Sequence, residues 1–233
     1  ALIDGYAQIG QGEFALKCFE QMQSDGFSPD AITFTCALNT CGNMGSVMKG
    51  KQIHDEILLK GLLREDAALG NALMGMYVKC GEFGKAQEVF DELPIRSLVS
   101  WSALITGYTE QGQYQEALNQ FEQMRNEGFY PDVVSFMCIL KTCSGIGALH
   151  KGIQIHNEIF SKGLLEKDIE LGNALVDMYV KCSQLERARK VFDELLVQDV
   201  VAWTALISGY TQEGRGEEAV ECFELMLEKG QSP

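Results

Sequence analysis

The feature that most restricts the fold of this chain is an internal repeat, because segments of its 233 residues recur at a constant offset of 102. Asn71–Leu73 recurs as Asn173–Leu175, and Trp101 recurs as Trp203. A chain that repeats itself in this way builds its core by stacking copies of one supersecondary unit, and each copy contacts only its neighbours. The sequence therefore predicts a repeat architecture.

The period of 102 residues divides into three related repeat units of 36, 31 and 35 residues. The chain begins at Ala1 without a methionine, and we expect both of its ends to be cut from a longer protein. A targeting peptide would lie upstream of such a cut. The predicted repeat units are 31–66, 67–97, 98–132, 133–168 and 169–199, with partial units at 1–30 and 200–233.

Each repeat unit has the apolar spacing of two consecutive helices. In unit 98–132, Trp101, Leu104 and Tyr108 follow the i, i+3, i+7 spacing of one helix face, and a second stripe follows Gly112. One helix pair cannot bury its apolar face, whereas stacked pairs bury a continuous one. Because strand signals are absent, we predict an all-α fold, an α-solenoid of stacked helix-turn-helix pairs.

The acidic charge of the chain restricts its partners. It has 33 Asp and Glu residues against 19 Lys and Arg, which gives a net charge of −14. Such a chain does not coat nucleic acid non-specifically, although a net charge does not determine where the charges sit. No apolar run approaches the roughly 18 residues of a membrane span, so we expect no membrane partner.

The eight cysteines form neither a metal-binding nor a disulfide pattern. They contain no C-x-x-C pair, so we predict reduced and mostly buried thiols. Cys36 and Cys41 recur as Cys138 and Cys143, but residues five apart lie roughly 140° apart around a helix, which suits a shared metal poorly. We expect no metal and no cofactor.

Two families of helical repeat are similar to these units. Unit 98–132 resembles the tetratricopeptide pattern, but it has Ile105 and Met124 where that family has small residues. The alternation of 35, 36 and 31 residues, and the phrase VSWSALITGY at 99–108, resemble the pentatricopeptide repeat family in its plant P-L-S subclass. In that resemblance the P units are 98–132 and the partial units 1–30 and 200–233, the L units are 31–66 and 133–168, and the S units are 67–97 and 169–199.

The resemblance implies a right-handed α-solenoid that binds single-stranded RNA sequence-specifically, with one unit addressing one base. It also implies a plant organelle RNA-processing factor for C-to-U RNA editing, located in a mitochondrion or chloroplast. The partners would be RNA together with editing-complex proteins or a deaminase domain. The alternative is a tetratricopeptide-like scaffold for protein–protein interaction, which the acidic charge would suit.

The resemblance assigns base recognition to the fifth and the last residue of each repeat unit. The fifth residue starts the first helix and the last lies in the loop before the next unit, so we expect stacking to bring them together. Short polar side chains suit this role because they both donate and accept hydrogen bonds. The pairs expected to favour cytosine, guanine and uracil in turn are Asn71/Ser97, Ser102/Asp132 and Asn173/Asp199.

Other units are incomplete or less readable. Thr204 is a further fifth residue that would favour a purine, and Asp30 is a further last residue. The partners of both lie outside the chain. The L unit 133–168 has Met137 as its fifth residue, and we assign no base to it because a thioether is only a weak acceptor.

The resemblance also gives roles to residues around each base. The second residue of a unit should wedge between successive bases as an apolar face, whereas Glu170 departs from this pattern and would repel a phosphate. Lys79 and Lys181 lie eight residues after the fifth position on the same helix face, so they are expected phosphate contacts. We therefore predict modest affinity, with roughly two released counterions. The apolar second residues are Val99, Val201, Val134 and Ile32.

Each of these residues also has a structural interpretation. The polar fifth and last residues can satisfy backbone donors as helix caps or in turns. Trp101 and Trp203 are predicted to be core residues rather than base-stacking ones, because they share a helix face with other apolar residues. His54 and His156 are expected to be satisfied or surface histidines.

An enzymatic reading has little support in the sequence. His54–Glu56 and His156–Glu158 match the H-x-E of zinc deaminases, but the P-C-x-x-C that completes that site is missing, and both matches recur with the repeat period. We therefore predict a chain that is not itself an enzyme. A cysteine- or zinc-dependent enzyme remains the third hypothesis, which a stoichiometric metal assay tests.

Overall fold

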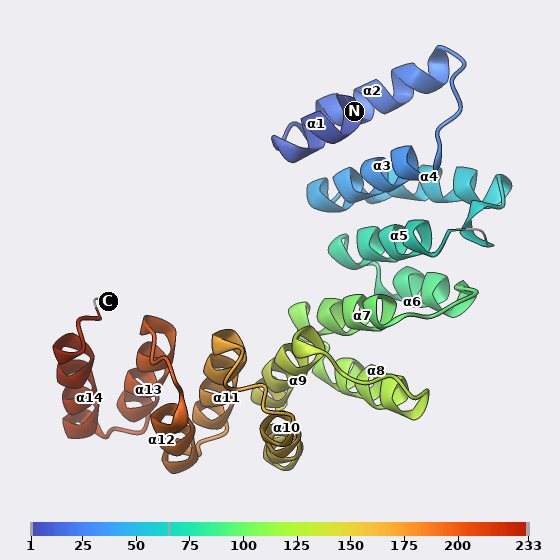
Figure 1. Ribbon diagram of the computed structural model, residues 1–233. Helices are drawn as coiled ribbons and strands as arrows, with labels where there is room; N and C mark the ends of the chain where they lie inside the picture. Colours follow the sequence, from blue (N-terminus) through green and yellow to red (C-terminus); the bar gives the residue numbers. More distant parts are fainter. Residues whose placement is uncertain (1, 65, 232–233) are drawn as a thin grey trace. The chain divides into compact units, whose positions relative to one another are not determined.

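The computed structural model describes residues 2–64 and 66–231. Within these ranges the chain consists of fourteen α-helices and one short 3-10 helix, with no strand, which confirms the predicted all-α architecture (Figure 1). None of the described helices has the length and apolar character needed to cross a membrane. The helices are α1 Leu2–Gln8, α2 Gly12–Ser24, α3 Ala31–Met44, α4 Val47–Leu59, η1 Leu62–Arg64, α5 Ala67–Lys79, α6 Phe83–Glu92, α7 Leu98–Glu110, α8 Tyr114–Asn126, α9 Val133–Ile146, α10 Leu149–Ser161, α11 Ile169–Lys181, α12 Leu185–Glu194, α13 Val200–Gln212 and α14 Gly216–Glu228.

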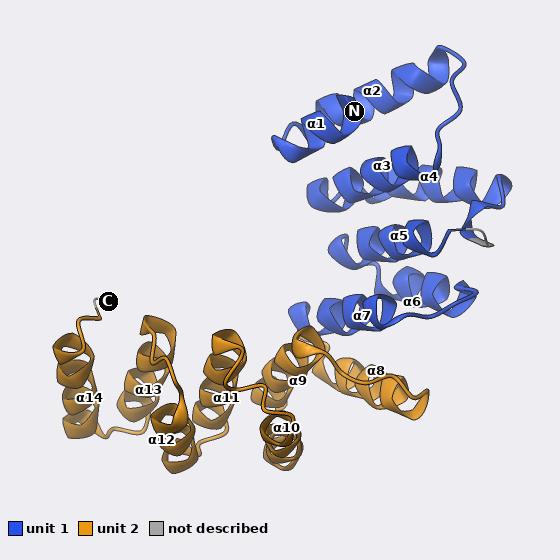
Figure 2. Cartoon of the chain, viewed as in Figure 1, with its two compact units in different colours: residues 1–111 blue, residues 112–233 orange. Residues whose placement is uncertain are grey.

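The chain divides into two compact parts, the N-terminal half (residues 1–111) and the C-terminal half (residues 112–233), coloured separately in Figure 2. The division falls between α7 and α8, inside repeat unit 98–132. In the N-terminal half α1, α3, α5 and α7 each pack against the next, and in the C-terminal half α9, α11 and α13 do the same. In each half, the first helices of successive repeat units therefore form one continuous layer.

Side-chain caps determine where the first helices begin. In α3, α5, α7, α9, α11 and α13, the residue before the helix has an extended backbone, and its side-chain oxygen accepts a hydrogen bond from a backbone N–H of the first turn. Ser97 also forms a capping box with Ser100. The capping interpretation of these residues is thus confirmed. The capping residues are Asp30, Asp66, Ser97, Asp132, Asp168 and Asp199.

Glycine sets the spacing between neighbouring first helices. A Cβ at Gly209 of α13 would lie 2.7 Å from Cγ1 of Val180 on α11, and a Cβ at Gly107 of α7 would lie 2.3 Å from Cγ1 of Val78 on α5. Both distances are well below van der Waals contact, so a side chain at either position would push the helices apart. The same close approach therefore occurs in both halves, at positions related by the repeat.

The two tryptophans lie in the core. Trp101 is 0% exposed and Trp203 is 1% exposed. Each indole packs edge-on against a phenylalanine of the preceding second helix, Phe90 or Phe192, with ring centroids 4.5 Å apart. The prediction that these residues are core residues is confirmed, and neither ring is available to stack on a base.

Candidate nucleic-acid interface

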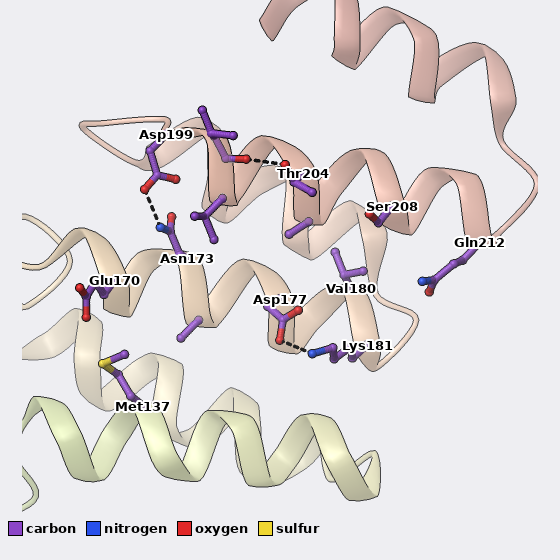
Figure 3. A pocket seen from close by; sticks show the side chains of 14 residues that line it. Met137, Glu170, Asn173, Asp177, Val180, Lys181, Asp199, Thr204, Ser208 and Gln212 are labelled. Carbon is purple, nitrogen blue, oxygen red and sulfur yellow. Dashed lines mark hydrogen bonds and ion pairs between the residues drawn. The ribbon is translucent and has the colours of Figure 1, made fainter. Parts of the chain in front are cut away.

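A groove lies along the layer of first helices in the C-terminal half (Figure 3). It has a volume of about 850 Å³ and is lined by side chains of α9, α11 and α13 and by the cap residue before α13. Three successive repeat units contribute to it, because their first helices stack side by side. The residues of the sequence analysis that meet here are Met137, Glu170, Asn173, Lys181, Asp199, Val201 and Thr204.

Asp199 connects the cap of α13 to the fifth residue of the preceding unit. Its Oδ1 accepts a hydrogen bond from the Ala202 backbone N–H at 3.0 Å. Its Oδ2 accepts one from Asn173 Nδ2 at 2.9 Å, which Figure 3 shows. Asn173 Oδ1 is buried and has no hydrogen-bond partner. The amide of Asn173 is therefore held in one orientation, with its carbonyl oxygen as the unpartnered acceptor.

The fifth residues Asn71, Ser102 and Asn173 are recessed, whereas the apolar second residues are exposed. Asn173 and Ser102 are each 8% exposed, and Asn71 is half-buried. By contrast, Val201 is 61% exposed and lines the groove. Exposed apolar side chains beside recessed polar ones are the arrangement expected of a surface that holds flat, partly apolar ligands. The other apolar second residues are exposed as well: Val99 65%, Val134 50% and Ile32 74%.

The two lysines expected to contact phosphate have different partners. Lys79 Nζ donates to Asn43 Oδ1 at 2.7 Å, so its charge is not neutralised by that partner. Lys181 Nζ lies 2.8 Å from Asp177 Oδ2 in an ion pair, and both residues line the groove. Sequence reasoning missed Asp177. A comparison at the repeat offset would have found it, because the equivalent position in the N-terminal half is Gly75.

In the N-terminal half the pair Asn71/Ser97 is less constrained. Asn71 Oδ1 is buried without a partner, as in Asn173. Ser97 Oγ is occupied by Ser100, whose backbone N–H and hydroxyl both contact it. Among the described residues, no hydrogen bond connects Ser97 to the Asn71 amide, so that amide is not held in one orientation.

Among the remaining predicted recognition residues, Asp132 and Asp30 cap helices and Thr204 lines the groove. Asp132 Oδ1 accepts from the Ser135 backbone N–H at 2.8 Å, and it belongs to the C-terminal half while Ser102 belongs to the N-terminal half. Their pairing stays a prediction. Thr204 is exposed, lines the groove and donates its hydroxyl to the Val200 carbonyl. Asp30 accepts two hydrogen bonds from Thr33, which lower the pKa of Asp30.

His54 and His156 each lie between a second helix and the next first helix, and neither lines the groove. His54 Nδ1 is 2.8 Å from the Tyr77 hydroxyl, and His156 Nδ1 is 2.8 Å from the Tyr179 hydroxyl. Burial lowers the pKa of both histidines below 6.5. Both are thus partly buried histidines paired with a tyrosine through Nδ1, as predicted for His156, whereas Nε2 of His54 is buried without a partner.

The described cysteines are free thiols, and the buried ones are poorly ionised. Burial raises the pKa of Cys41 to about 11 and that of Cys143 to about 12. A thiol with a pKa in that range is almost fully protonated at neutral pH and is therefore a poor nucleophile. Among residues 2–64 and 66–231 there is also no group of three His, Cys, Asp or Glu side chains that could hold a metal ion.

Known repeat patterns match most of the chain. The PPR repeat family pattern matches residues 1–43 and 96–145, and the PPR repeat pattern matches residues 71–97, 173–200 and 201–231. A pentatricopeptide repeat-containing protein of Arabidopsis thaliana is 39% identical over 225 residues, which are 97% of this chain and 39% of the relative. A second Arabidopsis relative, named chloroplastic, is 37% identical, and the match covers 100% of this chain and 43% of the relative.

A third Arabidopsis relative, named mitochondrial, is 36% identical, and the match covers 98% of this chain and 36% of the relative. The chain thus spans between 36% and 43% of the length of the last two relatives. Among solved structures, the pentatricopeptide repeat protein PPR10 in complex with an 18-nt psaJ RNA element matches with a TM-score of 0.86 at 25% identity, over 99% of this chain and 35% of that one. Repeat spacing, stacked helix pairs and these matches agree: the chain belongs to the pentatricopeptide repeat family.

Proposed function

We propose that this chain binds single-stranded RNA sequence-specifically, with one repeat unit addressing one base. The observation that carries this proposal is the groove in which Asn173, Asp199 and Val201 meet, with one buried acceptor oxygen left without a partner. An unpartnered buried acceptor is costly, so it favours a ligand that supplies a donor. The likeness to PPR10, whose solved complex contains an RNA element, supports the choice of ligand.

The hydrogen bonds around Asn173 favour uracil for this unit. Asp199 accepts a hydrogen bond from one N–H of the Asn173 amide, which fixes the amide and leaves its carbonyl oxygen as the buried acceptor without a partner. Uracil presents a ring N–H donor at its Watson–Crick edge, whereas cytosine and adenine present a ring-nitrogen acceptor there. Two facing acceptors repel, so the groove disfavours cytosine and adenine. Guanine also has a ring N–H, and the family resemblance selects uracil between the two.

The other units follow the same logic. Ser97 does not hold the Asn71 amide, so Asn71 is able to turn its NH₂ toward the acceptor edge of cytosine. We assign guanine to Ser102/Asp132 and a purine to Thr204, and Asp30 is the last residue of the partial unit 1–30. The exposed second residues form the apolar faces between successive bases. Lys79 and Lys181 are the proposed phosphate contacts.

We further propose that the chain is part of a plant organelle RNA-processing factor of the P-L-S subclass, acting in C-to-U editing. The alternation of repeat units of 35, 36 and 31 residues supports the subclass. Relatives named chloroplastic and mitochondrial support an organelle. The editing chemistry would come from a deaminase domain or from editing-complex proteins, because the described residues serve as recognition and packing groups.

Selection from a pool of randomised single-stranded RNA tests the proposal. We expect enrichment of cytosine followed by guanine, then one weakly specified base, then uracil. Asn173→Thr should shift the last preference from uracil toward guanine, because the threonine hydroxyl is shorter and leaves room for a purine. If no RNA is enriched while a protein partner is captured, the chain is instead a protein-binding scaffold.

A further inference from the structure

The groove contains acidic groups that base recognition does not use. Asp177 lies on α11 one turn before Lys181, lines the groove, and pairs with Lys181 at 2.8 Å. In the N-terminal half the equivalent lysine is Lys79, which donates to the neutral amide oxygen of Asn43. The residue equivalent to Asp177 is Gly75. The two S units thus present the same lysine with and without a neighbouring carboxylate.

This difference changes what a phosphate meets at each lysine. A lysine that contacts a phosphate releases a counterion from the RNA, which strengthens binding at low salt. Lys181 and Asp177 together carry no net charge, so a phosphate gains little attraction and must displace an existing ion pair. Their side chains are 55% and 39% exposed, which leaves room for an approaching phosphate but places it beside the carboxylate as well.

A second acidic residue acts in the same direction. Glu170 lines the same groove near the start of α11, where the N-terminal half has Ala68. Relative to unit 67–97, the first helix of unit 169–199 therefore has two more carboxylates and no additional cation. The neighbouring α9 adds one cation, Lys141, beside Asp177 and Lys181 where the N-terminal half has Asn39, so the net change is one negative charge. The polar atoms that address a base are kept, while the attraction for the backbone is reduced.

We propose that Asp177 attenuates phosphate binding at Lys181, so that the 169–199 unit contributes base selectivity with little backbone affinity and the 67–97 unit supplies the backbone contact. The proposal rests on RNA binding as the proposed function. Asp177 is a tuning residue rather than a contact residue, and it acts through the charge of Lys181. The chain accordingly binds RNA with a shallower salt dependence than its lysine positions alone would give.

The salt dependence of RNA affinity tests this proposal on the 233-residue chain. We compare Asp177→Asn with Asp193→Asn, which removes the same charge from an exposed ion pair with Arg189 on α12, outside the groove-lining residues. For Asp177→Asn the slope of log affinity against log salt should steepen by about 0.7, so its affinity relative to wild type rises roughly fivefold as salt falls tenfold. Asp193→Asn should keep the wild-type slope. Adding Lys181→Ala to Asp177→Asn should abolish the gain.

The reciprocal change uses the N-terminal half. A Cβ at Gly75 would meet no atom within 4 Å, so Gly75→Asp is accommodated and places a carboxylate one turn before Lys79. Its slope should become shallower by about 0.7. An unchanged slope in Asp177→Asn, or equal shifts in Asp177→Asn and Asp193→Asn, would overturn the attenuation while leaving RNA binding intact. Weaker binding by Asp177→Asn would show instead that Asp177 positions Lys181. Absence of RNA binding by the wild-type chain would overturn the proposed function and this inference together.

Discussion

Replacing Asp199 by asparagine should reverse the base preference of the 169–199 unit from uracil to cytosine. In the structure one carboxylate oxygen of Asp199 caps Ala202 and the other holds the Asn173 amide nitrogen. An introduced amide has only one oxygen. If that oxygen keeps the cap of α13, the NH₂ of the introduced amide faces Asn173. The Asn173 amide must then turn so that its carbonyl oxygen accepts from this NH₂. The NH₂ of Asn173 then points at the base, where it meets the ring-nitrogen acceptor of cytosine.

The size of the effect follows from the hydrogen bond that each base makes or leaves unmade. A buried polar group that loses its partner costs roughly 2 kcal/mol relative to one that keeps it. This corresponds to about 30-fold in Kd, in favour of uracil for the wild type and of cytosine for Asp199→Asn. Stability should change little, because asparagine is as good an N-cap as aspartate. Asp199→Ala loses both the cap and the partner of Asn173, at a cost of roughly 2 kcal/mol or more.

Fluorescence anisotropy with two RNAs that differ only in uracil or cytosine at this position measures the reversal. Asp168→Asn is the matched control, because Asp168 caps α11 through the Leu171 N–H but closes the unit whose fifth residue is Met137, which has no amide to turn. The control should keep the wild-type ratio of Kd values. If Asp199→Asn still prefers uracil by the wild-type ratio, the orientation of Asn173 does not determine the base.

Three further predictions concern stability and the apolar faces. Because the pKa values of His54 and His156 are lowered below 6.5 by burial, the unfolded chain binds more protons, and the free energy of unfolding should fall as pH drops through 6.5. Denaturant midpoints above and below that pH measure this loss of stability. The double variant His54→Gln/His156→Gln should show a smaller dependence of stability on pH. A wild-type chain that is more stable in acid would contradict the prediction. Trp203→Ala should cost about 3–5 kcal/mol in urea unfolding, since its indole is fully buried against Phe192. Val201→Ser should weaken RNA binding without altering the preferred base and change stability by less than about 0.5 kcal/mol, because Val201 is 61% exposed; a loss comparable to that of Trp203→Ala would place Val201 in the core instead.

Much of the fold was predictable because its determinants are local. The apolar spacing around Trp101 indicates a helix. A short polar residue directly before such an apolar-periodic segment, for example Asp132, indicates the N-cap of the helix that follows. Both signals act within a few residues, so a single sequence contains them. The repeat offset then implies that neighbouring helix pairs pack in the same way, which the stacked first helices confirm.

The atoms of the candidate site were not predictable in the same way. Asn173 and Asp199 are 26 residues apart, and only the distance between α11 and the cap of α13 shows that one carboxylate holds the amide while capping a helix. The sequence alone left open whether Asp199 acts as a cap, in recognition, or in both. The structure shows that the capping role is compatible with a second hydrogen bond, because a carboxylate has two oxygens.

The sequence by itself determined the repeat, its helices, their caps and which side chains share a face, since these depend on periodicity and local hydrogen bonding. Tertiary structure decided which polar atoms remain unpartnered, which lysine is neutralised and how deeply Asn173 is recessed. Those properties depend on the spacing between stacked helices, which the close contact of Gly209 with Val180 sets. A hydrogen bond is made or lost over less than an ångström, and no periodic pattern specifies distances that finely.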